Sequence, residues 1–259
     1  MPRNPAHAQR RQQELARLLE RRPGVSTTWL ARHFGVNPMT IRRDLRLLEE
    51  SGLALRRYGG AVAAHRITFE FAFDRRLQRA LEEKRRIGDE AAQRIGRGQT
   101  VFLDTGTTTL QVARSLARRA IPCQIATSSL VIASELWGRQ HIELMLLGGR
   151  VRQGSPDLVG PAIEAMLERL TADLAILGSE GIDPARGSFA GDLEAARVAE
   201  RMAACARRVI VVADHSKLGL AGPVRYLRIN QIDEIITDRG APRSILTALR
   251  ARGVTVTTV

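Results

Sequence analysis

The sequence predicts an α/β protein with an N-terminal winged helix-turn-helix domain and a larger domain that contains a mostly parallel β-sheet. Two observations support this fold class. Residues 1–60 contain three helical segments separated by Pro, Gly and Asn, followed by a short strand. From residue 81 onward, short apolar segments alternate with helical segments, as in a parallel sheet covered by helices on both faces. We therefore expect domains at 1–60 and 81–259, joined by a linker at 61–80.

The composition of the 259-residue chain excludes disordered and membrane-spanning proteins. Hydrophobic residues make up 44% of the chain and charged residues 26%, which is too apolar for a disordered chain and too charged for a membrane protein. The longest apolar segments, such as 209–213, are far shorter than the roughly 20 residues of a spanning helix. We expect no membrane partner.

The N-terminus and the cysteines indicate a cytoplasmic protein. The first residues lack the apolar core of about 7–15 residues that a secretory signal requires. Cys123 and Cys205 are far apart and form no CxxC motif, so the sequence supports neither a disulfide framework nor a zinc site. The five histidines show no metal-ligand spacing. We expect no metal and no cofactor.

The net charge of +13 is distributed unevenly. Residues 1–60 contain 12 arginines and five acidic residues, whereas residues 61–259 contain 28 basic and 22 acidic residues. A concentration of basic residues at one end of a chain is typical of a protein that binds a polyanion. Lys84 and Lys217 are the only lysines among the 40 basic residues.

Capping residues and glycines mark the helices of the first domain. Ser26 or Thr27 can cap the second helix, because a hydroxyl there accepts a hydrogen bond from the first helical turn. Gly35 supplies a tight turn after that helix. Asn37 is a good N-cap for the third helix, and Pro38 suits its first position.

The third helix, over about 38–51, is expected to enter the major groove of DNA, as the second of two helices joined by a short turn. Arginines near its start can bind guanine bidentately. A strand over 53–58 and a Gly-Gly turn form a small wing near the DNA backbone. Each arginine pair, taken alone, could also be a solvent-exposed face. The predicted DNA contacts are Met39, Thr40, Arg42, Arg43, Arg56, Arg57 and Tyr58.

These residues resemble the DeoR-type winged helix of bacterial sugar-catabolism regulators, in the segments 36–45 (VNPMTIRRDL) and 57–61 (RYGGA). The family usually has Ser at the position of Asn37, and both residues cap helices. Asp44 is part of the motif. We expect it to orient a nearby arginine, because DNA phosphates would repel a carboxylate.

The linker contains Phe69, Phe71 and Phe73, and their alternation predicts one packed face. This face could serve to dock the linker or could form a subunit interface.

The second domain is predicted to contain strands at 100–103, 124–126, 142–147, 174–177, 209–213, 234–237 and 254–259. Helices are predicted at 82–96, 107–119, 129–138, 161–170, 193–206 and 242–251. In such sheets, ligands bind beyond the carboxyl ends of the strands.

Polar loops follow several of these strands. The loop at 104–109 (DTGTTT) opens a helix, and its N–H groups, hydroxyls and positive helix end favour a phosphate or carboxylate. It lacks the GK[ST] of a nucleotide triphosphatase. The ammonium of Lys217 suits a phosphate or a sugar hydroxyl. The predicted effector-binding residues are Asp104, Gly106, Thr107, Thr108, Ser128, Ser129, Gly148, Gly149, Glu180, Asp214, Ser216 and Lys217.

The loops are also similar to the DeoR-type sensor domain, in the segments 104–108 (DTGTT), 148–149 (GG), 192–195 (DLEA) and 213–219 (ADHSKLG). The family commonly has Thr-Asn-Ser where this chain has Thr127-Ser128-Ser129. The resemblance implies a phosphorylated sugar or related metabolite as effector and repression as the mode of regulation. It also implies double-stranded operator DNA as a partner, and homo-oligomers.

Two other functions are compatible with parts of this pattern. The sensor domain is similar in fold to ribose-5-phosphate isomerase, which raises a sugar-phosphate isomerase as an alternative. That chemistry needs a carboxylate base and acid partners, and only Glu180 survives from the isomerase's acid cluster. We therefore expect no catalytic residues and no enzyme. The second alternative is a DNA-binding protein without small-molecule control.

Overall fold

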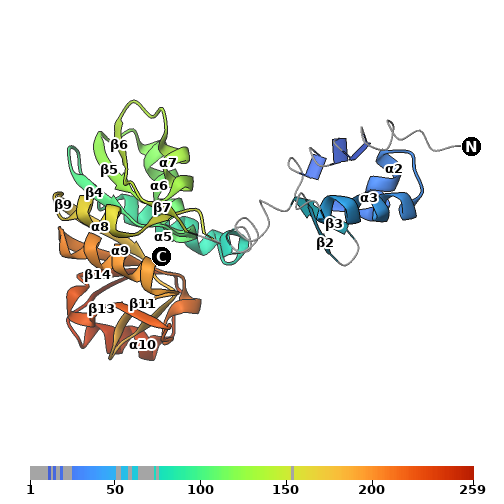
Figure 1. Cartoon of the computed structure of the whole chain (residues 1–259). Coiled ribbons are helices and arrows are strands. Elements are labelled where there is room, and N and C mark those ends of the chain that lie inside the picture. Colours follow the sequence, from blue (N-terminus) through green and yellow to red (C-terminus); the bar gives the residue numbers. More distant parts are fainter. Residues whose placement is uncertain are drawn as a thin grey trace, which may run out of the picture. The chain divides into compact units, whose positions relative to one another are not determined.

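The computed structural model of the chain describes residues 11–12, 14–15, 18–19, 25–50, 54–57, 60–63, 73, 76–152 and 155–259. The chain forms two compact units, Met1–Ala72 and Phe73–Val259 (Figure 1). The division falls inside the predicted linker at 61–80. Phe69 and Phe71 of that linker lie outside the described residues, whereas Phe73 is buried in the second unit.

The first unit has the elements of a winged helix. They are β1 (Val25–Ser26), α2 (Thr27–His33), α3 (Pro38–Glu50), β2 (Ala54–Arg57) and β3 (Gly60–Ala63). The strands form an antiparallel sheet in the order β1-β3-β2. The described residues between 11 and 19 are helical, as predicted.

Local hydrogen bonds explain where these helices begin. The Ser26 hydroxyl accepts a hydrogen bond from Trp29 N at 3.1 Å, and Asn37 Oδ1 accepts one from Met39 N at 2.8 Å. Both predicted N-caps are therefore confirmed. Gly35, between α2 and α3, has a φ of 60°, which only glycine adopts without strain.

One apolar cluster holds the first unit together. Its buried side chains come from every described helical segment: Leu15, Leu19, Val25, Leu30, Ala31, Ile41, Leu45 and Leu48. The wing extends further along the chain than predicted, because β3 begins at Gly60 and continues into the predicted linker. The sequence of β3, Gly-Ala-Val-Ala, lacks the alternation of polar and apolar residues that marks a strand. Its pairing with both β1 and β2 stabilises it as a strand.

The second unit is built on a seven-stranded sheet in which every neighbouring pair is parallel (Figure 1). Its order is β15-β14-β12-β9-β4-β5-β6. The strands are β4 (Thr100–Leu103), β5 (Cys123–Thr127), β6 (Ile142–Leu146), β9 (Ala172–Gly178), β12 (Ala206–Val212), β14 (Glu234–Thr237) and β15 (Thr255–Thr258). Each corresponds to a predicted strand: β4 and β14 have the predicted ends, and the ends of the others differ by up to three residues.

Helices cover both faces of this sheet. They are α5 (Leu81–Ala92), α6 (Thr107–Arg119), α7 (Leu130–Leu136), α8 (Pro161–Leu167), α9 (Leu193–Ala204) and α10 (Arg243–Arg250). Alternate residues of β4 point to opposite faces. Val101 and Leu103 pack in the cluster that contains residues of α5, α6 and α7, whereas Phe102 packs in the cluster that contains residues of α8, α9 and α10.

Several short elements were not predicted. They are β7 (Arg150–Val151), β8 (Leu158–Val159), β10 (Gly181–Asp183), β11 (Gly187–Ala190), β13 (Val224–Leu227) and the 3-10 helices η2 (His215–Lys217) and η3 (Ile229–Gln231). β7 pairs with β8, and β10, β11 and β13 form a small antiparallel sheet. In the part of the chain that the structure describes, no helix is both long enough and apolar enough to span a membrane.

The contact between α5 and α6 leaves no space for a side chain at Gly88. A Cβ there would lie 2.5 Å from the carbonyl carbon of Gln111 and 2.8 Å from the main-chain nitrogen of Val112. We expect Gly88→Ala to lower the free energy of unfolding by about 1–3 kcal/mol, because the helices must separate. Urea denaturation measures this change. Gly96→Ala is the control: its Cβ would approach only the Gln99 side chain, at 3.5 Å, and its effect should stay within about 0.5 kcal/mol.

Candidate DNA interface and effector site

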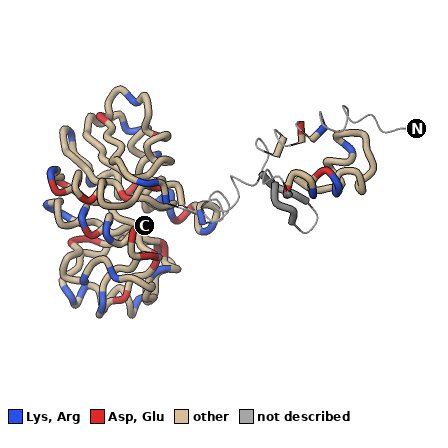
Figure 2. The backbone as a smooth tube through the Cα atoms, viewed as in Figure 1, with Lys and Arg blue, Asp and Glu red and all other residues tan. Residues whose placement is uncertain are grey.

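The predicted recognition helix α3 exposes its basic residues. Met39 is 64% exposed, Arg42 and Arg43 are exposed, and Thr40 is partly buried. Arg42 also donates a hydrogen bond to Met39 Sδ at 3.5 Å. Arg46 lies on the exposed part of the same helix and was missed by the sequence analysis, although its spacing from Arg42 is one helical turn. Figure 2 colours the Lys and Arg positions of the chain blue.

One acidic residue of α3, Asp44, faces the interior of the first unit. Asp44 is 3% exposed, and its carboxylate accepts hydrogen bonds from Arg11 Nε at 2.7 Å and Gln12 Nε2 at 3.0 Å. Asp44 therefore binds an arginine of the preceding helical segment, as expected, and its charge is kept away from the exposed face of α3.

The wing residues are described in part. β2 contains Arg56 and Arg57, and it pairs antiparallel with β3. Tyr58 lies outside the described residues.

In the second unit, the order of the parallel strands reverses between β4 and β9. From β4 the chain continues to β5 and β6 on one side, and from β9 it continues to β12, β14 and β15 on the other. Crossover segments leave such a point in opposite directions and open a crevice at the carboxyl ends of the two strands. Asp104 follows β4, and Gly178 ends β9.

Asp104 is a buried carboxyl at this switch point. Its Oδ2 accepts a hydrogen bond from Gly178 N at 3.1 Å, which joins the ends of the two strands. Burial raises the pKa of Asp104 to about 7, although hydrogen bonds from the Thr105 and Gly178 main chains act in the opposite direction. A carboxyl in this range can either accept or donate a hydrogen bond near neutral pH.

The helix α6 begins directly after Asp104. Gly106 is its N-cap, with a φ of 140° and no side chain to accept from the first turn. The N–H groups of that turn therefore keep their capacity to bind an acceptor. Thr107 and Thr108 are buried in this turn, and Thr109 donates a hydrogen bond to Gly106 O at 3.0 Å.

The two serines after β5 are buried beside this turn. β5 pairs with β4, so Thr127 stands opposite Leu103 at the same edge of the sheet. Ser129 caps α7, because its hydroxyl accepts a hydrogen bond from Ile132 N at 3.2 Å. The main-chain oxygen of Ser128 accepts one from Leu158 N. Ser129 thus has a structural role that the sequence analysis did not foresee.

Gly148 and Gly149 follow β6, two strands away from the switch point. A Cβ on Gly149 would lie 2.8 Å from Val159 O, so β8 approaches too closely for any other residue. Gly148 N donates to Met166 Sδ at 3.3 Å. Gly149 therefore allows β8 to approach closely, and the main chain of Gly148 contacts α8 through Met166.

An arginine after β7 is held by two acidic residues. Arg152 pairs with Asp157 at 2.9 Å and with Asp192, which caps α9 by accepting a hydrogen bond from Ala195 N at 2.9 Å. Asp157 raises the pKa of Asp104 and Arg152 lowers it, which places both charges near the switch point.

Glu180 and Lys217, both predicted effector contacts, bind each other. Lys217 Nζ donates to Glu180 Oε2 at 2.8 Å, and Arg76 donates to Glu180 Oε1 at 3.0 Å. Burial alone would raise the pKa of Glu180, but the hydrogen bond and charge of Lys217, with those of Arg76, lower it. Glu180 is therefore ionised and paired.

Asp214 organises the loop that contains Lys217. Its Oδ1 accepts a hydrogen bond from Ser216 N at 3.0 Å and another from the Ser216 hydroxyl. Its Oδ2 lies 3.9 Å from Lys84 Nζ. Lys84 is 4% exposed, and burial lowers the pKa of its ammonium, with Asp214 acting to raise it. The two lysines of the chain thus meet in one region of the fold.

His215 is fixed by the loop after β14. Its Nδ1 lies 2.8 Å from Asp238 Oδ2, and its main-chain N–H donates to Asp238 Oδ1 at 2.7 Å. Burial alone would raise the pKa of Asp238, but these hydrogen bonds and one from Gly240 lower it. The pair holds η2 against the neighbouring strand.

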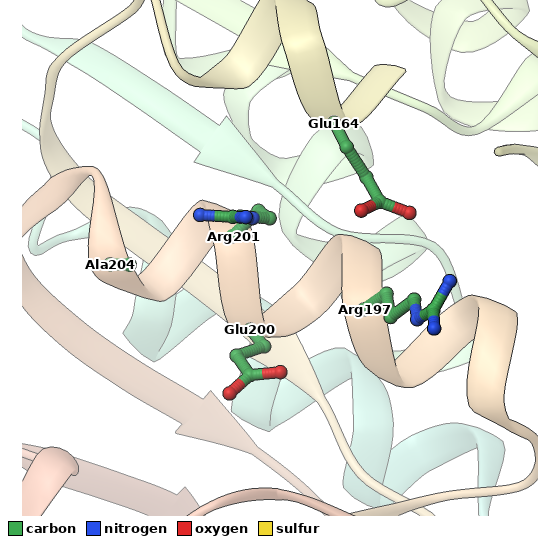
Figure 3. Close-up of a pocket in the computed structure, with 5 residues that line it drawn as sticks. All are labelled: Glu164, Arg197, Glu200, Arg201 and Ala204. Carbon is green, nitrogen blue, oxygen red and sulfur yellow. The ribbon is translucent and has the colours of Figure 1, made fainter. Parts of the chain in front are cut away.

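A separate charged cavity lies between α8 and α9, away from the predicted effector residues (Figure 3). Glu164 of α8 points toward α9, which contributes Arg197, Glu200, Arg201 and Ala204. Arg197, Glu200 and Arg201 are exposed, so this cavity is an open surface feature.

Comparisons with known proteins agree with both units. The DeoR-like helix-turn-helix domain matches residues 11–66, and the DeoR C terminal sensor domain matches residues 79–239. The HTH-type transcriptional regulator GlpR of Haloferax volcanii is 36% identical over 95% of this chain and 96% of its own length. The glycerol-3-phosphate regulon repressor of Escherichia coli (strain K12) is 34% identical over 90% of this chain and 91% of its own.

Two solved structures are similar at lower identity. The sorbitol operon regulator SorC of Klebsiella pneumoniae aligns with a TM-score of 0.44 and 12% identity over 93% of this chain and 98% of that chain. Ribose 5-phosphate isomerase A of Methanocaldococcus jannaschii aligns with a TM-score of 0.41 and 17% identity over 54% of this chain and 55% of that chain.

The winged helix and the sensor domain together define a DNA-binding transcriptional regulator. The chain belongs to the DeoR family, whose curated members matched here are named as regulators and repressors. It is a regulator and not an enzyme, as the sequence predicts.

Burial of Asp104 is expected to make stability depend on pH. The pKa of this carboxyl is raised from 3.8 to about 7, so the folded state favours the protonated form. The stability that this form contributes is complete below about pH 4 and is lost as the pH rises through about 7. Asp104→Asn does not titrate, so its stability relative to the wild type should increase by about 2–3 kcal/mol between about pH 5 and about pH 8. Urea denaturation at both pH values tests this, and a pH-independent difference would contradict it.

Proposed function

We propose that the protein is a cytoplasmic, homo-oligomeric repressor of a carbohydrate-catabolism operon, released from its operator DNA by a phosphorylated sugar or a related metabolite. The single observation that carries the effector assignment is the arrangement of charges at the carboxyl end of the sheet. The open N-terminus of α6 and the ammonium of Lys217 offer binding groups for a phosphate.

The neighbouring polar groups suit the rest of a sugar. Asp104 and the buried hydroxyls of Thr107, Thr108 and Ser128 lie at the ends of β4 and β5. Carboxyls and hydroxyls can bind the hydroxyl groups of a sugar in either direction. The relative from E. coli is named for the glycerol-3-phosphate regulon, and glycerol-3-phosphate is a phosphorylated polyol, which supports this class of effector.

The operator-binding surface is assigned to the exposed face of α3 and to the wing. Met39, Thr40, Arg42 and Arg43 would reach base edges, whereas Arg56, Arg57 and Tyr58 would contact the DNA backbone. The burial of Asp44 supports this assignment, because it leaves the exposed face of α3 basic.

Fluorescence anisotropy tests the whole proposal. The protein is titrated onto DNA from immediately upstream of its own gene, at one fixed salt concentration, with and without a panel of sugar phosphates. We expect tight binding that one compound releases. Binding that no compound changes, together with no thermal stabilisation by any of them, would favour a DNA-binding protein without small-molecule control.

Lys217→Ala is expected to lose release by the compound that releases the wild type. The variant removes the ammonium that would bind the phosphate, and charge-assisted hydrogen bonds of this kind contribute about 1.5–3 kcal/mol. The same anisotropy titration, with increasing effector, measures the loss. Equal release of variant and wild type at equal effector concentrations would remove Lys217 from the site.

Arg43→Ala is expected to weaken operator binding by about 1–3 kcal/mol, as the loss of a base contact does. Arg119→Ala is the matched control, since it removes the same charge from an exposed position at the end of α6. Anisotropy at one fixed salt concentration compares the two variants. An unchanged affinity of Arg43→Ala would exclude this arginine as a contact.

A further inference from the structure

One carboxylate holds two cations that come from distant parts of the chain. Glu180 Oε1 accepts a hydrogen bond from Arg76 at 3.0 Å, and Glu180 Oε2 accepts one from Lys217 at 2.8 Å. Arg76 precedes α5 at the start of the second unit, whereas Lys217 belongs to the loop after β12. Glu180 therefore connects the proposed effector site to the segment through which the chain reaches the first unit.

The segment that contains Arg76 has a strained backbone, and Lys84 as well as Glu180 binds it. Ala80 has a φ of 51°, a left-handed conformation that costs a non-glycine residue on the order of 1 kcal/mol or more. Lys84 donates hydrogen bonds to the main-chain oxygens of Arg76 and Arg79. Because strained backbone persists only where its surroundings fix it, the segment 76–80 depends on these contacts.

Two cations pair with the single carboxylate of Glu180. Arg76 and Lys217 together carry two positive charges, which match the charge of a phosphate dianion better than that of one carboxylate. In addition, Arg76 Nε is buried and has no hydrogen-bond partner among the described residues. A phosphate has more acceptor oxygens than a carboxylate and could satisfy this donor as well.

We infer that Glu180 is an internal anion that occupies the position of the effector's phosphate between Arg76 and Lys217, and that a phosphorylated effector displaces it. This inference rests on the proposed function and adds the route by which the effector acts on the connector. The displaced Glu180 no longer fixes Arg76 in its ligand-free position. The phosphate takes over the contact with Arg76 and extends it to Nε, so the effector favours a second arrangement of the strained turn at 76–80.

The direction in which Glu180→Gln changes the affinity for phosphate distinguishes this role from a purely structural one. Glu180→Gln removes the negative charge and preserves the shape of the side chain. If Glu180 competes with phosphate, the variant should bind inorganic phosphate about tenfold more tightly, because a repelling charge close to the ligand has gone. A residue that only supports the fold would give unchanged or weaker binding.

The experiment measures thermal stabilisation of the full chain over a series of inorganic phosphate concentrations, with chloride keeping the ionic strength constant. Arg76→Gln is the second variant and should bind phosphate about tenfold more weakly, because one charged donor is lost. Glu82→Gln and Arg85→Gln are the matched controls. They remove the same charges from an exposed pair on α5 that is joined at 2.6 Å, and they should behave as the wild type.

Three results would overturn the inference: phosphate binding by Glu180→Gln that is equal to or weaker than that of the wild type, unchanged binding by Arg76→Gln, or failure of the wild type to bind phosphate. If Glu180→Gln does not fold, the phosphate affinity of Arg76→Gln tests the inference. Failure of the proposed function is distinguishable, because it appears as operator binding by wild type that no sugar phosphate changes.

Discussion

The parallel pairing of β4 with β9 fixes the centre of the predicted effector site in the sensor domain. It is the one place where the order of the strands reverses, so the loops on its two sides leave in opposite directions. The hydrogen bond from Gly178 N to Asp104 then fixes the ends of the two strands against each other. These two strands and their loops position the N-terminus of α6 and Glu180, and the loop after β12 brings Lys217 to Glu180.

The parallel sheet could be predicted because most of its strands are short apolar segments between clear helix signals. The predicted strand at 100–103 and the predicted helix at 107–119 match β4 and α6 residue for residue. The antiparallel sheet of β10, β11 and β13 could not be predicted, because strands of only three or four residues show no usable periodicity. Tertiary pairing, and not local preference, creates it.

The site was predicted as separate loops, and the structure supplies the pairs within it. Glu180 and Lys217 were each expected to contact the effector, but nothing in the sequence shows that they bind each other. Arg76 is 104 residues from Glu180 and lies in the predicted linker, so it was missed. The sequence did offer a reason to single out Lys84. The chain contains only two lysines, Lys84 and Lys217, so the scarcity that drew attention to Lys217 applies equally to Lys84.

The scarcity of lysine has a practical consequence for labelling chemistry. Amine-selective reagents need an accessible side-chain amine, and Lys84 is buried under two main-chain carbonyl groups. Lys217, with 24% of its side chain exposed, is the one side-chain amine left to such a reagent in the folded chain. Side-chain labelling by an amine-coupled fluorophore or crosslinker would therefore be directed to the Glu180–Lys217 pair, without any engineered residue.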